Sequence, residues 1–224
     1  MMAVKQILSD LESLGDEKRK AHNVKHGISA DLQFGVKMGE IRKVAKKFEK
    51  AEKNVAIELW NTRILEAQLI STLLIKPEKL SIEELNSLVE TISFDYVADW
   101  FNSYIANKHP EKDKLLENWL KSDNKWALRS AGSLLASKIT KDAKDLNLGK
   151  LLDQIETEMP VAPQEVQWTM NFALAYIGIH HAEHRQKAIE IGNKLGIYKD
   201  YPVPRGCTSP FAPIWIEEMV NRQK

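Results

Sequence analysis

Helical periodicity runs through almost the whole of this 224-residue chain, and no segment shows sustained alternation of apolar and polar residues. Such alternation is the pattern of a half-buried β-strand, so the sequence predicts no strand. Apolar residues recur instead every three or four positions, in segments separated by short turns. The pattern predicts an all-α protein of about a dozen helices, each of roughly ten to sixteen residues.

Local signals mark the ends of several predicted helices. Asp16 is placed to cap the second helix, and Ser81 with Glu84 forms a capping box. Gly15 is a candidate C-terminal cap of the first helix, and the helix over residues 182–195 is expected to end at Gly196. The predicted helices span residues 4–14, 18–25, 41–48, 54–60, 64–75, 82–92, 95–107, 110–120, 124–139 (capped by Ser122 or Asp123), 148–158, 163–179, 182–195 and 213–222.

Helix pairs follow one another every few tens of residues, although no strict sequence repeat is present. This rhythm predicts an α-α superhelix, a solenoid of degenerate HEAT-like helix pairs, in one domain over residues 1–224. A Pro-rich segment near residues 200–213 is expected to be irregular. A compact helical bundle is the alternative arrangement.

The net charge of +1 conceals a strongly uneven distribution of charge. Residues 16–50 contain ten Lys or Arg and five acidic residues, a local charge of +5, whereas residues 81–99 contain five acids and no Lys or Arg. Lys43, Lys46 and Lys47 lie on one face of a predicted helix. The basic block indicates a surface that faces a polyanion, and a merely solvated helix face is the alternative.

Several classes of protein are disfavoured by what the sequence lacks. The single cysteine, Cys207, permits neither an intrachain disulfide nor a multi-cysteine metal site. No apolar run reaches the length of a membrane span, and the N-terminus lacks the apolar region of a signal peptide, so we expect a cytoplasmic protein without a membrane partner. His180 and His184 stand four residues apart, but no recognised ligand spacing completes a site, so we expect no metal.

The stretch from Ser93 to Ile139 carries the first group of candidate site residues. Asp95 and Asp99 share a helix face, and Trp100 follows directly. Arg129 lies on a later helix beside small residues, Gly132, Ser133 and Ala136, so that a bulky polymer is expected to approach this face closely. The alternative is structural, because aspartates often cap helices and arginines are usually solvated.

A second group of candidates lies near residue 170. Trp168 and Phe172 are four residues apart and Asn171 is three from Trp168, which places them on neighbouring positions of a helix surface. The functional interpretation is a surface that contacts bases or sugars. The alternative is a core position, which is the usual place of aromatic side chains at helical spacing.

Two stretches together resemble the AlkD-type DNA alkylation-repair family of HEAT-like DNA glycosylases. FGVKMGEIRKVAKKF resembles a segment in which a glycine-containing turn precedes a helix with regularly spaced basic residues. The central stretch FDYVADWFNSYIANKHPEKDKLLENWLKSDNKWALRSAG resembles the family's aromatic–acid helix, its KHPE turn and its SDNxW junction followed by an arginine. The resemblance covers residues 4–182, and the central stretch is its most specific part.

The resemblance implies a HEAT-like fold that holds duplex DNA and excises N3- or N7-alkylated purines without a cofactor or metal. It implies that Asp99 is the catalytic carboxylate, with Asp95 as the alternative in another register, and that Arg129 holds a phosphate. The family tryptophan four residues before the carboxylate is replaced by Asp95, and a second family tryptophan by Phe172. The further DNA contacts expected are Lys43, Lys46, Lys47, Trp100, Lys125, Trp126, Trp168, Asn171 and Phe172. Alternatives are a non-catalytic binder of damaged or branched DNA and a protein-interaction solenoid.

Overall fold

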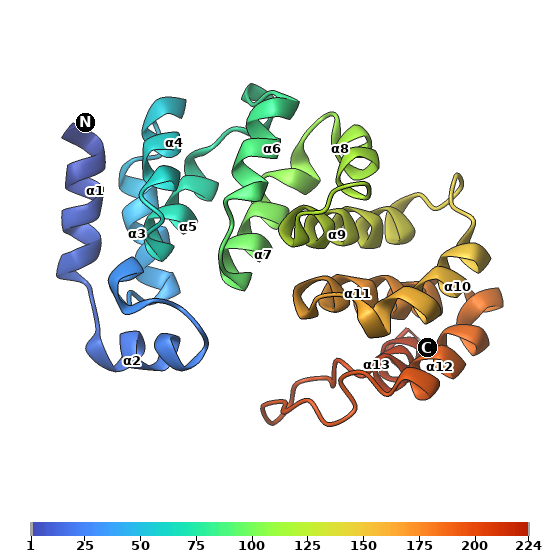
Figure 1. Cartoon of the computed structure of the whole chain (residues 1–224). Coiled ribbons are helices and arrows are strands. Elements are labelled where there is room, and N and C mark those ends of the chain that lie inside the picture. The colour runs from blue at the N-terminus through green and yellow to red at the C-terminus, as the bar shows by residue number, and fades with distance from the viewer. Residues whose placement is uncertain (1, 224) are drawn as a thin grey trace. The chain divides into compact units, whose positions relative to one another are not determined.

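The computed structural model describes residues 2–223, and every regular element in that range is helical (Figure 1). No strand occurs among these residues, which confirms the all-α prediction. The chain divides into two compact units, Met1–Lys112 and Asp113–Lys224. The expectation of one domain over residues 1–224 stays a prediction.

The first unit is built around α5, whose residues are almost all buried. This helix packs against α1, α3, α4 and α7, and Figure 1 shows α4 and α5 side by side. Such a central position explains its apolar sequence, because every face of the helix meets another helix. The helices of this unit are α1 (Met2–Ser13), α2 (Glu17–Lys25), α3 (Met38–Lys47), α4 (Lys53–Asn61), α5 (Leu65–Leu74), α6 (Ile82–Glu90) and α7 (Asp95–Tyr104).

A buried carboxylate on α5 holds the turn that leads into α3. Glu66 is 1% exposed, and its Oε1 accepts backbone N–H groups from Gly35 at 2.8 Å and Val36 at 3.0 Å. Its Oε2 accepts the N–H of Phe34 at 3.0 Å. Gly35 has φ +81°, and a Cβ there would collide with the carbonyl oxygen of Asp16, so only glycine fits this turn.

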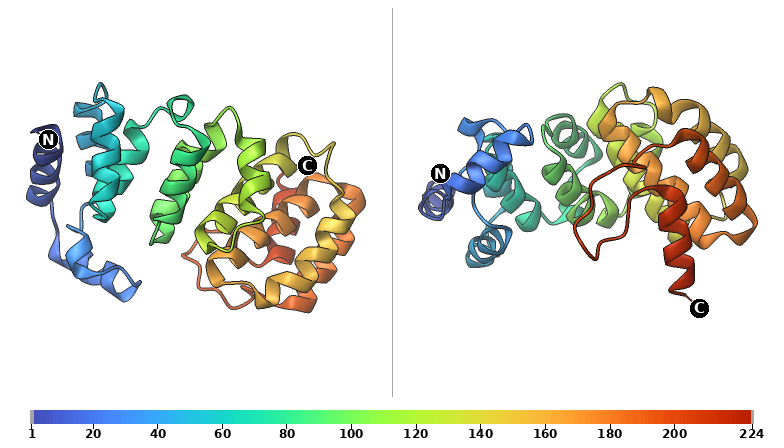
Figure 2. Two further views of the ribbon diagram at one scale, coloured as in Figure 1. Left: turned by 45° about the horizontal axis from the view of Figure 1, so that its top comes forward. Right: turned by 90° about the horizontal axis from the view of Figure 1, so that it is seen from below.

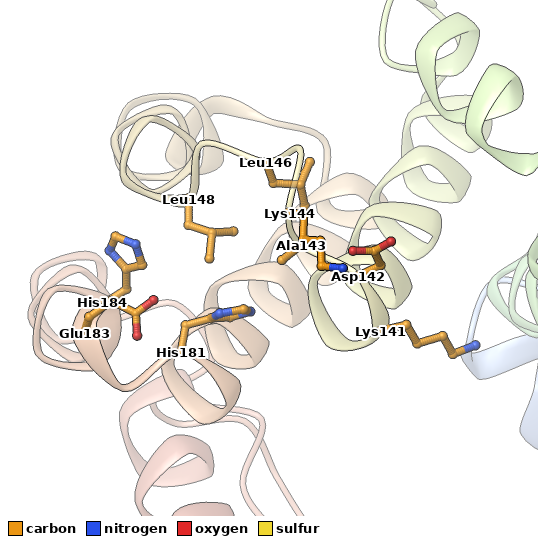
Figure 3. A pocket seen from close by; sticks show the side chains of 9 residues that line it. All are labelled: Lys141, Asp142, Ala143, Lys144, Leu146, Leu148, His181, Glu183 and His184. Atoms are coloured by element: carbon orange, nitrogen blue, oxygen red, sulfur yellow. The ribbon is translucent and has the colours of Figure 1, made fainter.

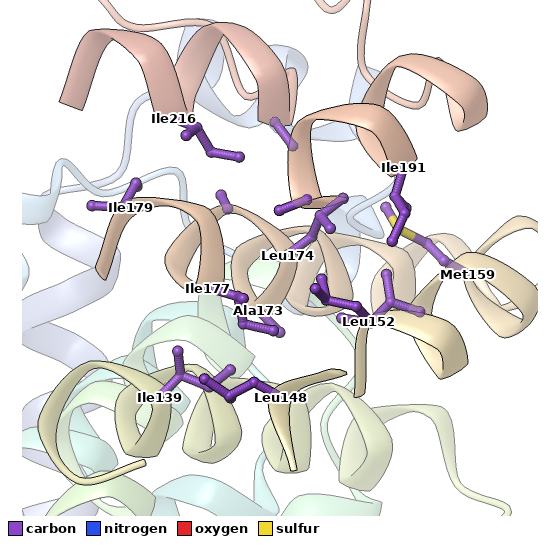
Figure 4. Close-up of a cluster of buried hydrophobic side chains, with 14 residues drawn as sticks. Ile139, Leu148, Leu152, Met159, Ala173, Leu174, Ile177, Ile179, Ile191 and Ile216 are labelled. Atoms are coloured by element: carbon purple, nitrogen blue, oxygen red, sulfur yellow. The ribbon is translucent and has the colours of Figure 1, made fainter. Parts of the chain in front are cut away.

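The second unit is built around α11, which packs against α9, α12 and α13. Its apolar core draws Ile139 from α9, Leu152 from α10, Leu174 and Ile177 from α11, and Ile216 from α13 into one cluster (Figure 4). The helices are α8 (Lys112–Trp119), α9 (Lys125–Lys141), α10 (Leu148–Glu158), α11 (Gln164–His180), α12 (Ala182–Leu195) and α13 (Ala212–Asn221).

Close packing of α9 on α11 corrects one expectation. The small-residue face of α9 was expected to admit a bulky polymer, but Gly132 lies against Thr169 of α11. A Cβ at Gly132 would fall 2.7 Å from the Cβ of Thr169. The expectation is wrong at this position because the small residues instead allow two helices to approach each other.

The predicted helix ends agree with the structure to within a few residues, as is usual for such signals. The cap of α2 by Asp16 and the capping box of Ser81 and Glu84 are confirmed. The end of α12 before Gly196 is confirmed, and Gly196 takes the left-handed conformation there. Gly15 follows α1 without the positive φ of a left-handed cap. The cap of α9 is Asn124, whose side chain accepts two backbone N–H groups, so the assignment to Ser122 or Asp123 is wrong.

Between α12 and α13 the chain has no helix, which agrees with the irregular Pro-rich segment expected there (Figure 2). Cys207 is exposed in this segment. Within residues 2–223 no helix combines the length and the apolar character needed to cross a membrane.

Candidate functional site

The basic face of α3 is exposed, but part of its charge is already paired. Lys43 lies 2.8 Å from Glu40, and Lys47 lies 3.1 Å from Asp10. Lys46 is exposed and forms no ion pair with any other described residue. Since exposed ion pairs are weak, Lys43 and Lys47 can exchange these partners for phosphates at little cost.

The aspartates and the tryptophan of α7 lie where the sequence predicts them. Asp95 and Asp99 are exposed on the helix, and the ring of Trp100 is partly buried. The residue at the N-cap is Phe94, and Asp95 is the first residue of the helix. All three candidates therefore belong to the first unit.

A cation lies directly over the ring of Trp100, and the sequence did not predict it. The guanidinium carbon of Arg42 on α3 is 4.4 Å from the Trp100 ring centroid. Its Nη1 donates a hydrogen bond of 2.6 Å to the hydroxyl of Tyr104. The ammonium of Lys108 lies 5.1 Å from the Tyr104 ring centroid. We call Arg42, Trp100, Tyr104 and Lys108 the cation–aromatic cluster.

His109 holds the KHPE turn after α7 in place through two hydrogen bonds. His109 is 3% exposed, and its Nδ1 accepts the backbone N–H of Glu111 at 3.2 Å. Nε2 must then carry the proton, which it donates to the carbonyl of Leu80 at 3.1 Å. The histidine therefore joins this turn to the start of α6.

In the second unit, the first turns of α9 and α11 meet through charged side chains. Nζ of Lys125 lies 2.5 Å from Glu165 Oε1 and 5.2 Å from the Trp126 ring centroid. Burial of Glu165 opposes ionisation, but hydrogen bonds from Lys125 and from its own backbone N–H, together with the charges of Lys125 and Arg129, outweigh it and lower the pKa of this carboxyl. Arg129 is only 2% exposed, and its Nη1 donates to the backbone carbonyl of Glu165 at 3.0 Å.

The aromatic residues of α11 belong to a larger cluster in the second unit. Trp168 packs on Phe172 at 5.4 Å between ring centroids, and it also contacts Tyr198 and Tyr201 at 5.3 and 5.7 Å. Phe172 packs on Trp215 at 5.1 Å. Trp168 and Phe172 remain partly exposed, so one edge of this cluster reaches the surface.

Asn171 has a different environment from its two aromatic neighbours. It is 1% exposed, and its Nδ2 donates to the carbonyl of Pro210 at 2.8 Å. This bond ties the irregular segment to α11. DNA contact by Asn171 stays a prediction. Its hydrogen bond to Pro210 shows that it helps to hold the irregular segment on α11.

His181 and His184 line a shallow pocket of about 440 Å³ between the α9–α10 loop and the start of α12, whereas His180 does not (Figure 3). His181 lies against the carbonyl of Ile139, with Nε2 at 3.0 Å. Among residues 2–223, no group of three or more His, Cys, Asp or Glu side chains is arranged to hold a metal.

Comparison with known protein families identifies the family of this chain. The model of the family described as "DNA alkylation repair enzyme" matches residues 7–202. The protein belongs to this family. No curated protein matches the chain at a significant level.

A solved structure of another protein has the same fold as this member of the DNA alkylation repair family. It is described as one of a new family of proteins related to the HEAT-like repeat DNA glycosylases, with affinity for branched DNA structures. The two chains are 19% identical, the TM-score is 0.78, and the match covers 98% of this chain and 94% of the other. The prediction of HEAT-like helix pairs is thereby confirmed.

Proposed function

We propose that this protein binds DNA and hydrolyses the glycosidic bond of N3- or N7-alkylated purines. The observation that carries the proposal is the local order of groups on α7. The exposed Asp99 directly precedes Trp100, and the Arg42 guanidinium lies over that ring. An acid, an aromatic ring and a cation thus come from one compact unit. The family match over residues 7–202 supports a role for these groups in DNA repair.

The chemistry suits a site with few groups. As the glycosidic bond breaks, positive charge develops on the sugar, and a nearby carboxylate stabilises that charge. The alkylated base leaves with the bonding electrons and becomes neutral, while water adds to the sugar carbon and loses a proton. We assign the carboxylate to Asp99, with Asp95 one helical turn earlier as the alternative. Because the base is already cationic, no cofactor or metal is required to make it leave.

The remaining candidates are proposed to hold the DNA or to support the groups that do so. Phosphates carry the affinity without base information, so lysines are suited to them, and partly exposed aromatic rings are suited to bases and sugars. Arg129 and Asn171 are proposed to act mainly by holding α11 and the irregular segment in place. The proposed direct contacts are Lys43, Lys46, Lys47, Trp100, Lys125, Trp168 and Phe172. Trp126 is only 7% exposed, so its ring is proposed to support Lys125, whose ammonium lies 5.2 Å from the ring centroid.

Base release from a duplex that contains N7-methylguanine tests the enzymatic part. Asp99→Asn should keep DNA affinity and lower the rate of release at least about tenfold, roughly 1.4 kcal/mol of transition-state stabilisation. If Asp95→Asn is the inactive variant instead, the carboxylate is Asp95. Absence of release by the unmodified protein refutes excision of this lesion.

Non-catalytic binding of branched DNA is the second candidate. Asp95 stands where the family pattern has a tryptophan, and the similar solved structure is of a protein with affinity for branched DNA. On this proposal the protein binds a four-way junction more tightly than a linear duplex and releases no methylated base from either. Absence of any salt-dependent DNA affinity would refute both candidates and favour a protein-interaction solenoid.

The basic face of α3 provides a test of DNA binding that does not depend on catalysis. Replacing Lys43, Lys46 and Lys47 with Glu should weaken duplex binding and flatten its salt dependence, because fewer counterions are released. The conservative variant Lys46→Arg should keep the slope, since it keeps the charge. An unchanged slope in the triple variant would mean that this face is only solvated.

A further inference from the structure

The cation–aromatic cluster of the first unit differs from the neighbouring basic groups in how its charge is held. Lys43 and Lys47 lie on carboxylates, at 2.8 and 3.1 Å. Arg42 is exposed and forms no ion pair with a described residue, and its partners are an aromatic ring and a neutral hydroxyl. Its full positive charge is therefore available to an anion from outside.

Two contacts fix the position of this guanidinium. The guanidinium carbon lies over the Trp100 ring, 4.4 Å from its centroid, and Nη1 donates to Tyr104 at 2.6 Å. Trp100 and Tyr104 are one turn apart on α7, with ring centroids separated by 5.5 Å. Because a flexible side chain loses entropy when it binds, a guanidinium already held in place binds an anion at lower cost.

The geometry leaves donors for such a ligand. A guanidinium has five N–H groups in one plane, and the bond to Tyr104 uses one of them. The other four form no hydrogen bond with a described residue. Two parallel N–H groups match two oxygens of a phosphate, and this pairing is among the strongest in proteins. Lys108, 5.1 Å from the Tyr104 ring centroid, adds a second exposed cation.

We propose that Arg42 binds a phosphodiester of the nucleic-acid backbone, and that Trp100 and Tyr104 are positioning residues that hold its guanidinium. The proposal rests on the proposed function, in which the protein binds DNA, and it changes the part given to Trp100. Arg42 covers one face of that ring, so Trp100 acts chiefly as the support of a phosphate contact. A purely structural role for Arg42, as a cover over an apolar ring, is the competing explanation.

The salt dependence of duplex binding separates these explanations. Fluorescence anisotropy of a labelled duplex is measured over a range of salt for the unmodified protein and for Arg42→Gln, Arg42→Lys and Tyr104→Phe. Arg42→Gln should lower affinity about tenfold and reduce the slope by about one unit, since one phosphate contact is lost. Arg42→Lys and Tyr104→Phe should keep the slope, because the positive charge remains. Both should bind a few-fold more weakly, because the first loses the planar guanidinium and the second loses the hydrogen bond that holds it in place.

Arg205→Gln is the matched control, because it removes the same charge from an exposed arginine of the irregular segment. Arg205→Gln should have a smaller effect than Arg42→Gln on both affinity and slope. An equal effect would mean that only the net charge of the protein matters, and it would overturn the proposal. Wild-type slope and affinity in Arg42→Gln would also overturn it. If that variant does not fold, unchanged affinity in Arg42→Lys and Tyr104→Phe overturns it instead. Absence of salt-dependent binding by the unmodified protein refutes DNA binding itself, and the Arg42 proposal with it.

Discussion

Replacement of Glu66 should destabilise the first unit more than almost any other single change to a polar residue there. Its Oε1 accepts two buried hydrogen bonds, from the N–H groups of Gly35 and Val36, and its Oε2 accepts a partly buried one from Phe34. In Glu66→Ala the two buried donors lose their acceptor, at a cost of about 1–3 kcal/mol each. Since native domains are stable by only about 5–15 kcal/mol, the loss is a large share of the total.

Glu66→Gln separates the hydrogen bonds from the charge. One amide oxygen can take the place of Oε1 and keep both buried bonds, whereas the amide nitrogen then faces the N–H of Phe34. We expect a loss of about 1–2 kcal/mol, smaller than that of Glu66→Ala. Burial of a charge also carries a desolvation penalty, and if that penalty outweighed the three bonds, Glu66→Gln would be neutral or stabilising.

Urea unfolding followed by far-UV circular dichroism, together with amide hydrogen exchange, measures these effects. The amides of Gly35 and Val36 should exchange slowly in the unmodified protein and lose protection in Glu66→Ala. Glu49→Gln is the control, because Glu49 is exposed and should change stability by less than about 0.5 kcal/mol. A stability of Glu66→Ala within that same margin would refute the reasoning.

Three further predictions concern the second unit. Asn124→Ala should cost about 1 kcal/mol in thermal unfolding, because two N–H groups at the start of α9 lose their cap, and an unchanged melting temperature would contradict this. Gly132→Ala should cost about 1–3 kcal/mol through its contact with Thr169, and Thr169→Ala in the same chain should recover part of it, so strictly additive losses would speak against that contact. Glu165→Gln should raise duplex affinity and steepen its salt dependence, because Lys125 loses its carboxylate partner, and lower affinity would count against Lys125 as a DNA contact.

The helices were predictable because their signals are local. The capping box at Ser81 and Glu84 lies within one turn, and Gly196 directly follows the last residue of a periodic segment. The cap of α9 was assigned wrongly because Ser122, Asp123 and Asn124 are all good cap residues, and propensity does not choose among neighbours. The hydrogen bonds of the folded chain select Asn124.

The contacts that shape the site were not predictable because they join distant parts of the chain. Glu66 binds backbone groups some thirty residues before it, and Arg42 meets Tyr104 across a separation of 62 residues. Nothing in the periodicity of α3 or α7 indicates that these two helices share a surface. Only the fold shows that Arg42, which the sequence places in a general basic block, lies on the ring of a candidate site residue.

Arg129 illustrates why residue type and helix face alone do not decide a role. Small residues beside an arginine suit a surface that admits a polymer, and they equally suit close packing of two helices. The contact of Gly132 with Thr169 shows that the small residue there serves helix packing. Arg129 donates a hydrogen bond to the backbone carbonyl of Glu165 on the same pair of helices. A side chain only 2% exposed must therefore be uncovered before it meets a phosphate. The exposed Arg42 needs no such step, so if the protein binds DNA as proposed, Arg42 is the better placed of the two arginines for the first phosphate contact.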